Sequence, residues 1–266
     1  MSTTRTHKEE FREKLLTYFD TFSKSLATNT GEWVVKGFID VYRNIYTISI
    51  DTKVVSKIVE LILFPIISRF AQINNYRLVL SEHQNHYPDI SLVLSDNTKI
   101  ALDLKSTYRV SKRSVSGFTL GAFTGYFRKR TSTKNITFPY SDYAAHFVLG
   151  VIYSRNEDVS DERDVYTLDD LQDIVSVIQD FTFLLNEKWE IANDHPGSGN
   201  TKNIGSTKNI EKLINGKGTF AAYGEEVFDD YWMNYLTKDM AKSIDSDIPY
   251  RNLEEYWQWR QRAPKR

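Results

Sequence analysis

Two aspartates and a lysine stand at spacings that favour metal-dependent chemistry on a phosphodiester. Asp103 and Lys105 are two residues apart in an alternating run, so in a β-strand they project from the same face. Asp89 precedes another alternating run just upstream. Two carboxylates supply the oxygen ligands that a hard cation such as Mg²⁺ prefers. A metal and a nearby ammonium group suit the attack of water on a phosphate, because both stabilise developing negative charge; the lysine could also position and deprotonate the water.

The register of the two runs can be predicted from their apolar residues. Alternating residues on either side of a polar turn predict a β-hairpin over 89–104. If residue i faces residue 192 − i, Ile90 faces Leu102 on a buried face, and Asp89 faces Asp103 on the other face. A slip of one residue would oppose apolar to polar side chains throughout. Opposed carboxylates repel each other, and a divalent cation between them would turn that repulsion into ligation.

Other candidate ligands are less specific. Glu60 lies on a helix predicted before the hairpin and is either a third carboxylate of the site or a solvated helix residue. His83 and His86 are three residues apart, but a zinc site would need a further ligand, so surface or hydrogen-bonded roles are expected. His146 lies in an apolar stretch and is expected in the core.

Several site classes are excluded by what the sequence lacks. There is no cysteine, which removes disulfides, thiolate metal sites and cysteine nucleophiles, and favours a reducing compartment. No Gly-rich loop has the spacing of a P-loop or a dinucleotide fingerprint, so no ATP, GTP or NAD is expected as a cofactor. The longest apolar stretch, 58–67, is too short to span a bilayer, and no membrane partner is predicted.

The charges are segregated although the 266-residue chain has a formal net charge of only −1. Residues 105–134 hold eight Lys or Arg and no acid, whereas residues 156–173 hold eight acids and one arginine. The basic stretch adjoins the Asp/Lys motif and predicts a surface for a polyanion. The alternative is a pair of solvated loops.

The surrounding elements indicate one mixed α/β domain without a dividing linker. Apolar spacing predicts a helix over 11–26, aromatic and β-branched residues predict a strand within 31–49, and Asp51 and Thr52 are expected to cap a helix that Pro65 kinks or ends. The remaining expectations are a buried strand over 147–153, mixed helix and strand signals over 168–185, a Gly/Ser/Asn loop over 195–206, and helices in the Trp- and Tyr-rich end, 231–259.

Pro88-Asp89, then thirteen residues, then Asp103-Leu104-Lys105 resembles the motif of the PD-(D/E)xK nuclease superfamily. A longer ordered set of segments resembles the type II restriction endonucleases within it. These segments are Asp51-Thr-Lys-Val with Glu60-Leu61, Gln84-Asn-His-Tyr-Pro-Asp89, Ile100-Ala-Leu-Asp-Leu-Lys105, Phe118-Thr-Leu-Gly121, Thr133-Lys-Asn-Ile136 and Gly197-Ser-Gly-Asn-Thr201 with Asn203-Ile-Gly-Ser206. The resemblance covers about residues 51–260, whereas the region before Asp51 has no clear match and is about fifteen residues longer.

The resemblance implies an α/β fold with a mixed β-sheet core flanked by helices, in a homodimeric, Mg²⁺-dependent endonuclease that cuts both strands of a palindromic DNA site. Asp89 and Asp103 would be metal ligands, Lys105 the catalytic lysine, and Glu60 an auxiliary acidic ligand. The single nuclease domain would span 1–266, with dimerisation through 33–50 and part of 165–185.

The same resemblance assigns the DNA contacts and a target, GATATC cut to blunt ends. The major-groove loop within 195–206 would use Gly197, Ser198, Gly199, Asn200, Thr201 and Lys202; Gln84 and Asn85 would approach the minor groove; Ser106, Thr107, Thr124 and Lys134 would lie near phosphates. An asparagine side chain can hydrogen-bond to the edge of adenine. Contacts to the DNA phosphates position the protein but do not read the base sequence. The chain departs from the family pattern at His83, Ser106, Gly125 and Lys202.

Three other functions remain open from the sequence. A non-catalytic, sequence-specific DNA-binding protein would keep the basic surface but would not need Asp89, Asp103 and Lys105 on one face. A structure-specific nuclease of the same superfamily would prefer branched DNA. A binder of small phosphorylated ligands would need a loop signature that the sequence does not contain.

A restriction enzyme would act in the bacterial cytoplasm beside a separately encoded DNA methyltransferase.

Overall fold

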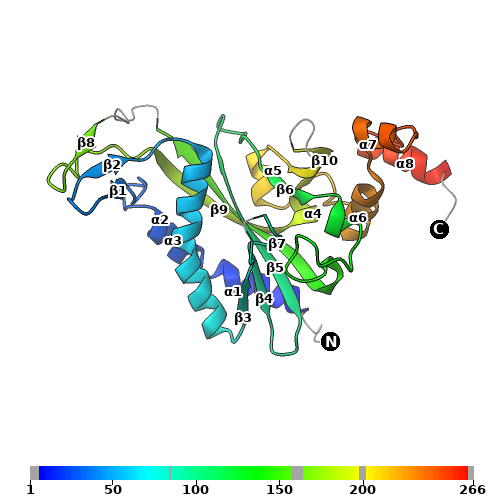
Figure 1. Ribbon diagram of the computed structural model, residues 1–266, viewed down its shortest axis with the longest axis horizontal. Helices are drawn as coiled ribbons and strands as arrows, with labels where there is room; N and C mark the ends of the chain where they lie inside the picture. Colours follow the sequence, from blue (N-terminus) through cyan, green and yellow to red (C-terminus); the bar gives the residue numbers. More distant parts are fainter. Residues whose placement is uncertain (1–5, 84, 157–163, 198–201, 263–266) are drawn as a thin grey trace.

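A five-stranded mixed sheet forms the centre of the molecule. The computed structural model describes residues 6–83, 85–156, 164–197 and 202–262 (Figure 1). The sheet has the order β3-β4-β5-β7-β9. Its strands are β3 (Arg77–Leu80), β4 (Ile90–Val93), β5 (Lys99–Tyr108), β7 (Tyr143–Arg155) and β9 (Ile178–Glu187). β5 and β7 are parallel, and the other neighbours are antiparallel, so the expected mixed sheet is confirmed.

Three helices cover one face of this sheet: α1 (His7–Leu16), α2 (Phe19–Leu26) and α3 (Thr52–Ile73). Phe11, Phe22 and Leu63 from these helices join Ile100 and Leu102 of β5 in one hydrophobic cluster. The helix expected over 11–26 is therefore helical but divided into two, α1 and α2.

The other face carries a second layer of short elements and a second hydrophobic cluster. A small sheet of order β10-β11-β6 lies in it, built from β6 (Thr119–Ala122), β10 (Ala192–Pro196) and β11 (Asn203–Ser206). The helices of this part of the chain are η1 (Gly125–Phe127), η2 (Tyr140–Asp142), α4 (Lys188–Ile191), α5 (Ile210–Ile214), α6 (Glu225–Asn234), α7 (Lys238–Ser243) and α8 (Leu253–Arg262). The residues expected as a loop over 195–206 thus include β11 and the end of β10.

A separate three-stranded sheet, β1-β2-β8, lies at one end of the molecule, at the upper left in Figure 1. It contains β1 (Gly37–Ile39), β2 (Ile45–Thr47) and β8 (Val165–Tyr166). The single strand predicted within 31–49 is in fact a hairpin, because Asp40 accepts hydrogen bonds from the backbone amides of Tyr42 and Asn44 and turns the chain there.

The prediction for α3 is correct at its start, and of the two outcomes expected at Pro65, a kink or an end, the end is wrong. The Asp51 side chain accepts hydrogen bonds from the amides of Lys53 and Val54, as an N-cap does. The helix nevertheless continues through Pro65 to Ile73. Its buried face, which includes Leu63 and Ile67, packs on the sheet on both sides of the proline, and this burial outweighs the roughly 3 kcal/mol that an internal proline costs.

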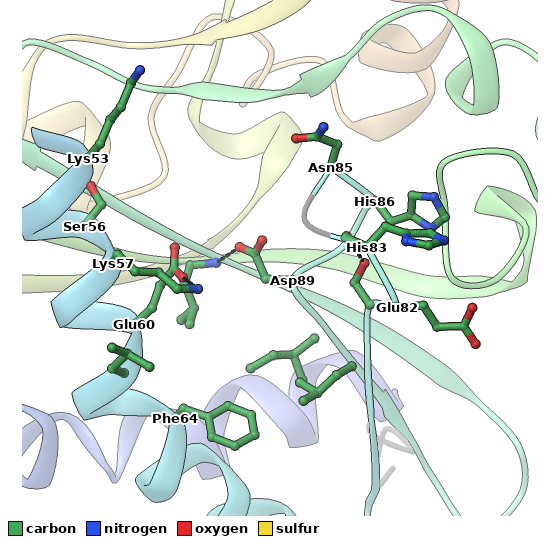
Figure 2. A pocket seen from close by; sticks show the side chains of 15 residues that line it. Lys53, Ser56, Lys57, Glu60, Phe64, Glu82, His83, Asn85, His86 and Asp89 are labelled. Carbon is green, nitrogen blue, oxygen red and sulfur yellow. Dashed lines mark hydrogen bonds and ion pairs between the residues drawn. The ribbon is translucent and has the colours of Figure 1, made fainter.

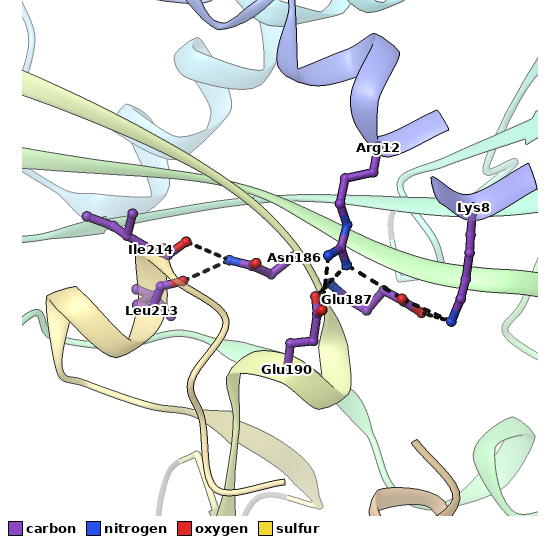
Figure 3. Close-up of polar contacts among 7 residues, drawn as sticks. All are labelled: Lys8, Arg12, Asn186, Glu187, Glu190, Leu213 and Ile214. Atoms are coloured by element: carbon purple, nitrogen blue, oxygen red, sulfur yellow. Dashed lines mark hydrogen bonds and ion pairs between the residues drawn. The ribbon is translucent and has the colours of Figure 1, made fainter. Parts of the chain in front are cut away.

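Ion pairs join α1 to the end of β9 (Figure 3). Arg12 donates two hydrogen bonds to the Glu190 carboxylate, at 3.0 and 2.5 Å, and its guanidinium lies 3.5 Å from Glu187. Lys8 lies 3.2 Å from the same Glu187 carboxylate, which is buried. These cations offset the cost of burying Glu187. Among the described residues, no helix has both the length and the apolar character needed to cross a bilayer.

Candidate active site

Asp89, Asp103 and Lys105 lie together on the face of the central sheet that carries the second layer. The Lys105 ammonium is 3.4 Å from an Asp89 carboxylate oxygen and 3.2 Å from an Asp103 carboxylate oxygen. The side chains are 35%, 5% and 24% exposed for Asp89, Asp103 and Lys105, so solvent reaches the group chiefly at Asp89 and Lys105.

The hairpin between β4 and β5 produces this arrangement. Ile90 pairs with Leu102 and Ser91 with Ala101, which confirms the register predicted from the alternating residues. Leu102 belongs to the cluster under α3, whereas Ala101 belongs to the cluster on the opposite face. Strand alternation therefore turns Asp103 and Lys105 toward the second layer.

The carboxylates also bond to the neighbouring backbone. The Asp89 amide donates to Asp103 Oδ1 at 3.2 Å, and the Leu104 amide donates to Asp89 Oδ2 at 2.8 Å. These bonds fix the orientation of both acids before any ligand arrives.

Burial and mutual repulsion change the acid–base properties of the group. Burial, followed by the negative charge of Asp103, raises the pKa of Asp89 to about 6, although Lys105 and the Leu104 amide act in the opposite direction. For Lys105, burial alone would lower the pKa, but attraction to Asp103 and Asp89 outweighs it and the pKa is raised. Lys105 is therefore a cation at neutral pH, which favours charge stabilisation over proton abstraction.

Glu60 approaches from the helix layer. Its carboxylate lies 2.8 Å from Lys57, and both residues line a cavity of about 680 Å³ whose opposite wall includes Asp89 (Figure 2). Within the described part of the chain, no three histidine or carboxylate side chains form a cluster that could hold a metal ion. Asp89 and Asp103 have the hard oxygen donors that fit Mg²⁺, a metal that keeps several waters, so two carboxylates suffice for it.

A second cavity, of about 300 Å³, connects the acids to segments that the sequence assigned to DNA contacts. Its walls include Asp89, Asp103 and Lys105, together with Asn85, Gly121, Tyr126, Asn135 and Asn203. Asn203 begins β11, the strand that follows the predicted recognition loop. Asp89, Asp103 and Lys105 thus share one cavity with a residue of the expected recognition loop over 195–206, whereas Glu60 does not line it.

The residues predicted near phosphates occupy two different environments. The Ser106 hydroxyl bonds to the Ser56 hydroxyl at 2.7 Å, and the buried Thr107 hydroxyl donates to the Gly117 carbonyl at 3.3 Å. Thr124 and Lys134 line an open cavity of about 480 Å³, which also contains Lys129. A phosphate could reach this second pair directly.

The predicted recognition loop is described only at its ends. Gly197 follows β10, and the exposed Lys202 precedes β11. Gly197 packs closely on Thr119 and Gly205, so a side chain at Gly197 would collide with them. Gln84, Ser198, Gly199, Asn200 and Thr201 lie outside the described residues.

His146 lies in the core, as the sequence predicted, and His83 lies at the surface. His146 is buried, and its Nδ1 lies 2.8 Å from the Tyr87 hydroxyl. His83 and His86 contact each other edge to face, with ring centroids 4.6 Å apart.

One charged residue near the site was not anticipated. Lys188 is 1% exposed, and its ammonium lies 3.9 Å from the centre of the Tyr87 ring. In the sequence Lys188 stands between Glu187 and Glu190, just after an apolar run and before a tryptophan. The apolar neighbours are the one feature of the sequence that indicates burial at this lysine. Its neighbours come from distant segments, so its environment could not be predicted.

Comparisons with known proteins found a matching family model and a similar restriction enzyme. A family model described as "Restriction endonuclease EcoRV" matches residues 29–261. The chain is 37% identical over 234 residues to the type II restriction enzyme EcoRV of Escherichia coli, covering 87% of this chain and 92% of that protein. Among solved structures, the NlaIV restriction endonuclease aligns over 97% of both chains with 12% identity and a TM-score of 0.42.

Proposed function

Because the chain belongs to the EcoRV restriction endonuclease family, and is therefore a type II site-specific deoxyribonuclease, we propose that it is a Mg²⁺-dependent enzyme that cuts both strands of GATATC to blunt ends. The observation that carries the proposal is the joint position of Asp89, Asp103 and Lys105 at a cavity shared with Asn85 and Asn203. Hydrolysis of a phosphodiester at a defined position in a sequence requires the hydrolysing side chains and the base-reading segments to lie close together.

The three side chains divide the chemistry between them. Asp89 and Asp103 would hold Mg²⁺, which supplies a polarised phosphoryl oxygen and a more acidic bound water. Lys105 lies within 3.4 Å of a carboxylate oxygen of each acid, so its ammonium group would stabilise negative charge on the phosphoryl group. Glu60, which lines the neighbouring cavity with Asp89, is the auxiliary acid of this proposal.

Base recognition would come from the hairpin formed by β10 and β11. Asn200 and Thr201, with the backbone of Gly197 and Gly199, would read base edges in the major groove. Ser198 and Lys202 complete this loop, and Gln84 and Asn85 would approach the minor groove. Lys134 and Thr124 would contact phosphates at their open cavity, and Ser106 and Thr107 would support the same backbone from β5.

A homodimer would present two such sites to a palindrome. The sheet β1-β2-β8 exposes a group of apolar side chains: Phe38 (53%), Ile39 (58%), Val41 (90%), Tyr42 (82%) and Val165 (57%). Exposed apolar groups of this kind mark protein–protein contacts. This sheet combines segments from 33–50 and 165–185, so we assign the dimer contact to it within one nuclease domain.

We also place the enzyme in the bacterial cytoplasm, where a separate methyltransferase would protect the host's GATATC sites.

Plasmid cleavage tests the proposal. A plasmid with one GATATC site should be linearised in Mg²⁺ and not with chelator, and sequencing of the ends should show a blunt cut at the centre of the site. Asp103→Ala should abolish the reaction, whereas Asp96→Asn, at the exposed hairpin turn, should cut like the wild type. Staggered ends, another hexamer, or preferential cutting of branched DNA would contradict the proposal.

A further inference from the structure

Lys188 is a buried cation without a hydrogen-bonding partner among the described residues. Its side chain is 1% exposed, and its ammonium makes no hydrogen bond within the described structure. The adjacent Glu187 does not neutralise it, because that carboxylate is bound by Lys8 and Arg12 of α1 (Figure 3). Isolated buried lysines are costly, so a position that keeps one needs an explanation.

Aromatic rings surround the ammonium group. It lies 3.9 Å from the centre of the Tyr87 ring and 5.4 Å from that of Tyr140, both within the range of a cation–π interaction. Gly121 closes a further side, since a Cβ at this residue would lie 3.4 Å from the ammonium and 3.0 Å from the Tyr126 hydroxyl. The lysine is therefore confined against the Tyr87 ring.

The Tyr87 ring in turn determines how the chain enters the active site. Tyr87 is two residues before Asp89, and its ring stacks on Tyr126 at 5.3 Å. Its hydroxyl bonds to His146, and its carbonyl accepts from the Thr137 amide at 2.9 Å. Each contact limits the rotation of this residue, and Lys188 supplies the charged one.

Burial lowers the pKa of Lys188 to about 8; Asp103 acts to raise it and Lys105 to lower it. The side chain is therefore mostly protonated at neutral pH, as a cation–π interaction requires. Geometry links the lysine to the acids: Gly121 and Tyr87, which both adjoin the ammonium group, line the cavity that contains Asp89 and Asp103.

We propose that Lys188 is a positioning residue that holds the Tyr87 ring by a cation–π interaction and thereby fixes Asp89 opposite Asp103. The inference rests on the proposed function in that Asp89 is a metal ligand there. Lys188 acts through Tyr87 and does not contact the substrate.

The test compares Lys188→Met with Tyr87→Leu and Tyr87→Phe in the full-length protein. Methionine keeps the length of the side chain and removes the charge; leucine removes the ring and phenylalanine keeps it. Mn²⁺ affinity is measured without DNA by electron paramagnetic resonance of the free ion, beside single-turnover cleavage in Mg²⁺. Lys99→Met is the matched control, because Lys99 also lies over a ring, Phe138, at 5.4 Å, away from the acids.

Lys188→Met and Tyr87→Leu should each lower Mn²⁺ affinity and the cleavage rate about tenfold or more. The double variant should be no worse than either single variant, since both remove one interaction. Tyr87→Phe keeps the ring and loses only the His146 hydrogen bond, so its loss of Mn²⁺ affinity and cleavage should be smaller than that of Tyr87→Leu. Lys99→Met should stay near wild type. The melting temperature of Lys188→Met should not fall, because an unpaired buried charge has been removed.

Two results would overturn the inference. Wild-type Mn²⁺ affinity and cleavage in Lys188→Met would show that the lysine only fills space. A rise in Mn²⁺ affinity would show that it acts by its charge alone, without positioning Asp89. The Mn²⁺ titration needs no DNA, so the inference and the proposed DNA target fail separately.

Discussion

The backbone amide of Asp89 donates a hydrogen bond to the Asp103 carboxylate 3.2 Å away, across the hairpin that joins β4 and β5. In return, the amide next to Asp103, that of Leu104, donates to the Asp89 carboxylate at 2.8 Å. Each carboxylate therefore accepts a hydrogen bond from the backbone of the segment that carries the other acid. The hairpin and the catalytic group are one structure, and a substitution at either acid has two separable effects.

Substitutions at Asp103 should separate those effects. Asp103→Asn and Asp103→Ala should both reduce cleavage at least about a hundredfold, since a ligand is lost. Asparagine keeps an acceptor for the Asp89 amide, whereas alanine leaves that partly buried amide unpaired and should cost about 1–3 kcal/mol of unfolding free energy. Urea unfolding and plasmid nicking measure the two effects. Nicking at the wild-type rate by either variant would remove Asp103 from the mechanism.

Glu225 should make stability depend on pH. Burial, then the negative charges of Glu187 and Asp229, raise its pKa from 4.5 to about 7, with Lys8 and Arg130 acting in the opposite direction. The folded protein thus binds this proton more tightly than the unfolded chain, so the Glu225 contribution to stability falls as pH rises from about 4.5 to about 7.

Glu225→Gln should therefore be more stable than wild type at pH 8 and not at pH 4, as measured by urea unfolding. Glu226→Gln, at the exposed neighbour, is the control and should show no such difference. An equal gain at both pH values would mean that the substitution acts through packing.

Asn200 and Lys134 should affect DNA binding in different ways. Asn200→Ala should cost about 1–3 kcal/mol of discrimination at one base pair, because an adenine-reading contact is lost. Lys134→Ala should weaken binding to all sequences alike and reduce the salt dependence by about one ion. Binding titrations on single-base variants of GATATC, at several salt concentrations, measure both. A uniform loss in Asn200→Ala would reassign that residue to the phosphates.

The apolar sheet should control association. Val41→Glu places a charge at a side chain that is 90% exposed in the single chain and would be buried in the proposed dimer. Sedimentation should show a monomer, and linearisation of plasmid should give way to slow nicking. Ile244→Glu, at a 63% exposed isoleucine outside both this sheet and the basic stretch 105–134, is the control. A dimer that survives Val41→Glu would move the contact elsewhere.

The active-site hairpin could be predicted because its information is local. Alternation of residues on both sides of one turn determines which side chains face each other, and this relation needs no distant partner. The start of α3 was predictable for the same reason, since Asp51 caps it through adjacent amides.

The errors have longer-range or less visible causes. Pro65 stays inside α3 because sheet packing on both sides holds the helix together, and the sequence does not show that packing. The turn at Asp40 is not visible in the composition of 31–49, because a single side chain that bonds to nearby amides makes it inside an apolar stretch. The surroundings of Lys188 combine Tyr87, Gly121 and Tyr140 from three distant segments, a contact set that no spacing rule provides.

The three residues proposed to cleave the bond lie within 89–105, whereas the hairpin proposed to choose the target, formed by β10 and β11, follows much later in the chain. Selection can therefore act on the two separately. A lineage could acquire a new target sequence through substitutions in the β10–β11 hairpin while the β4–β5 hairpin stays unchanged. Its methyltransferase would have to acquire the same new target.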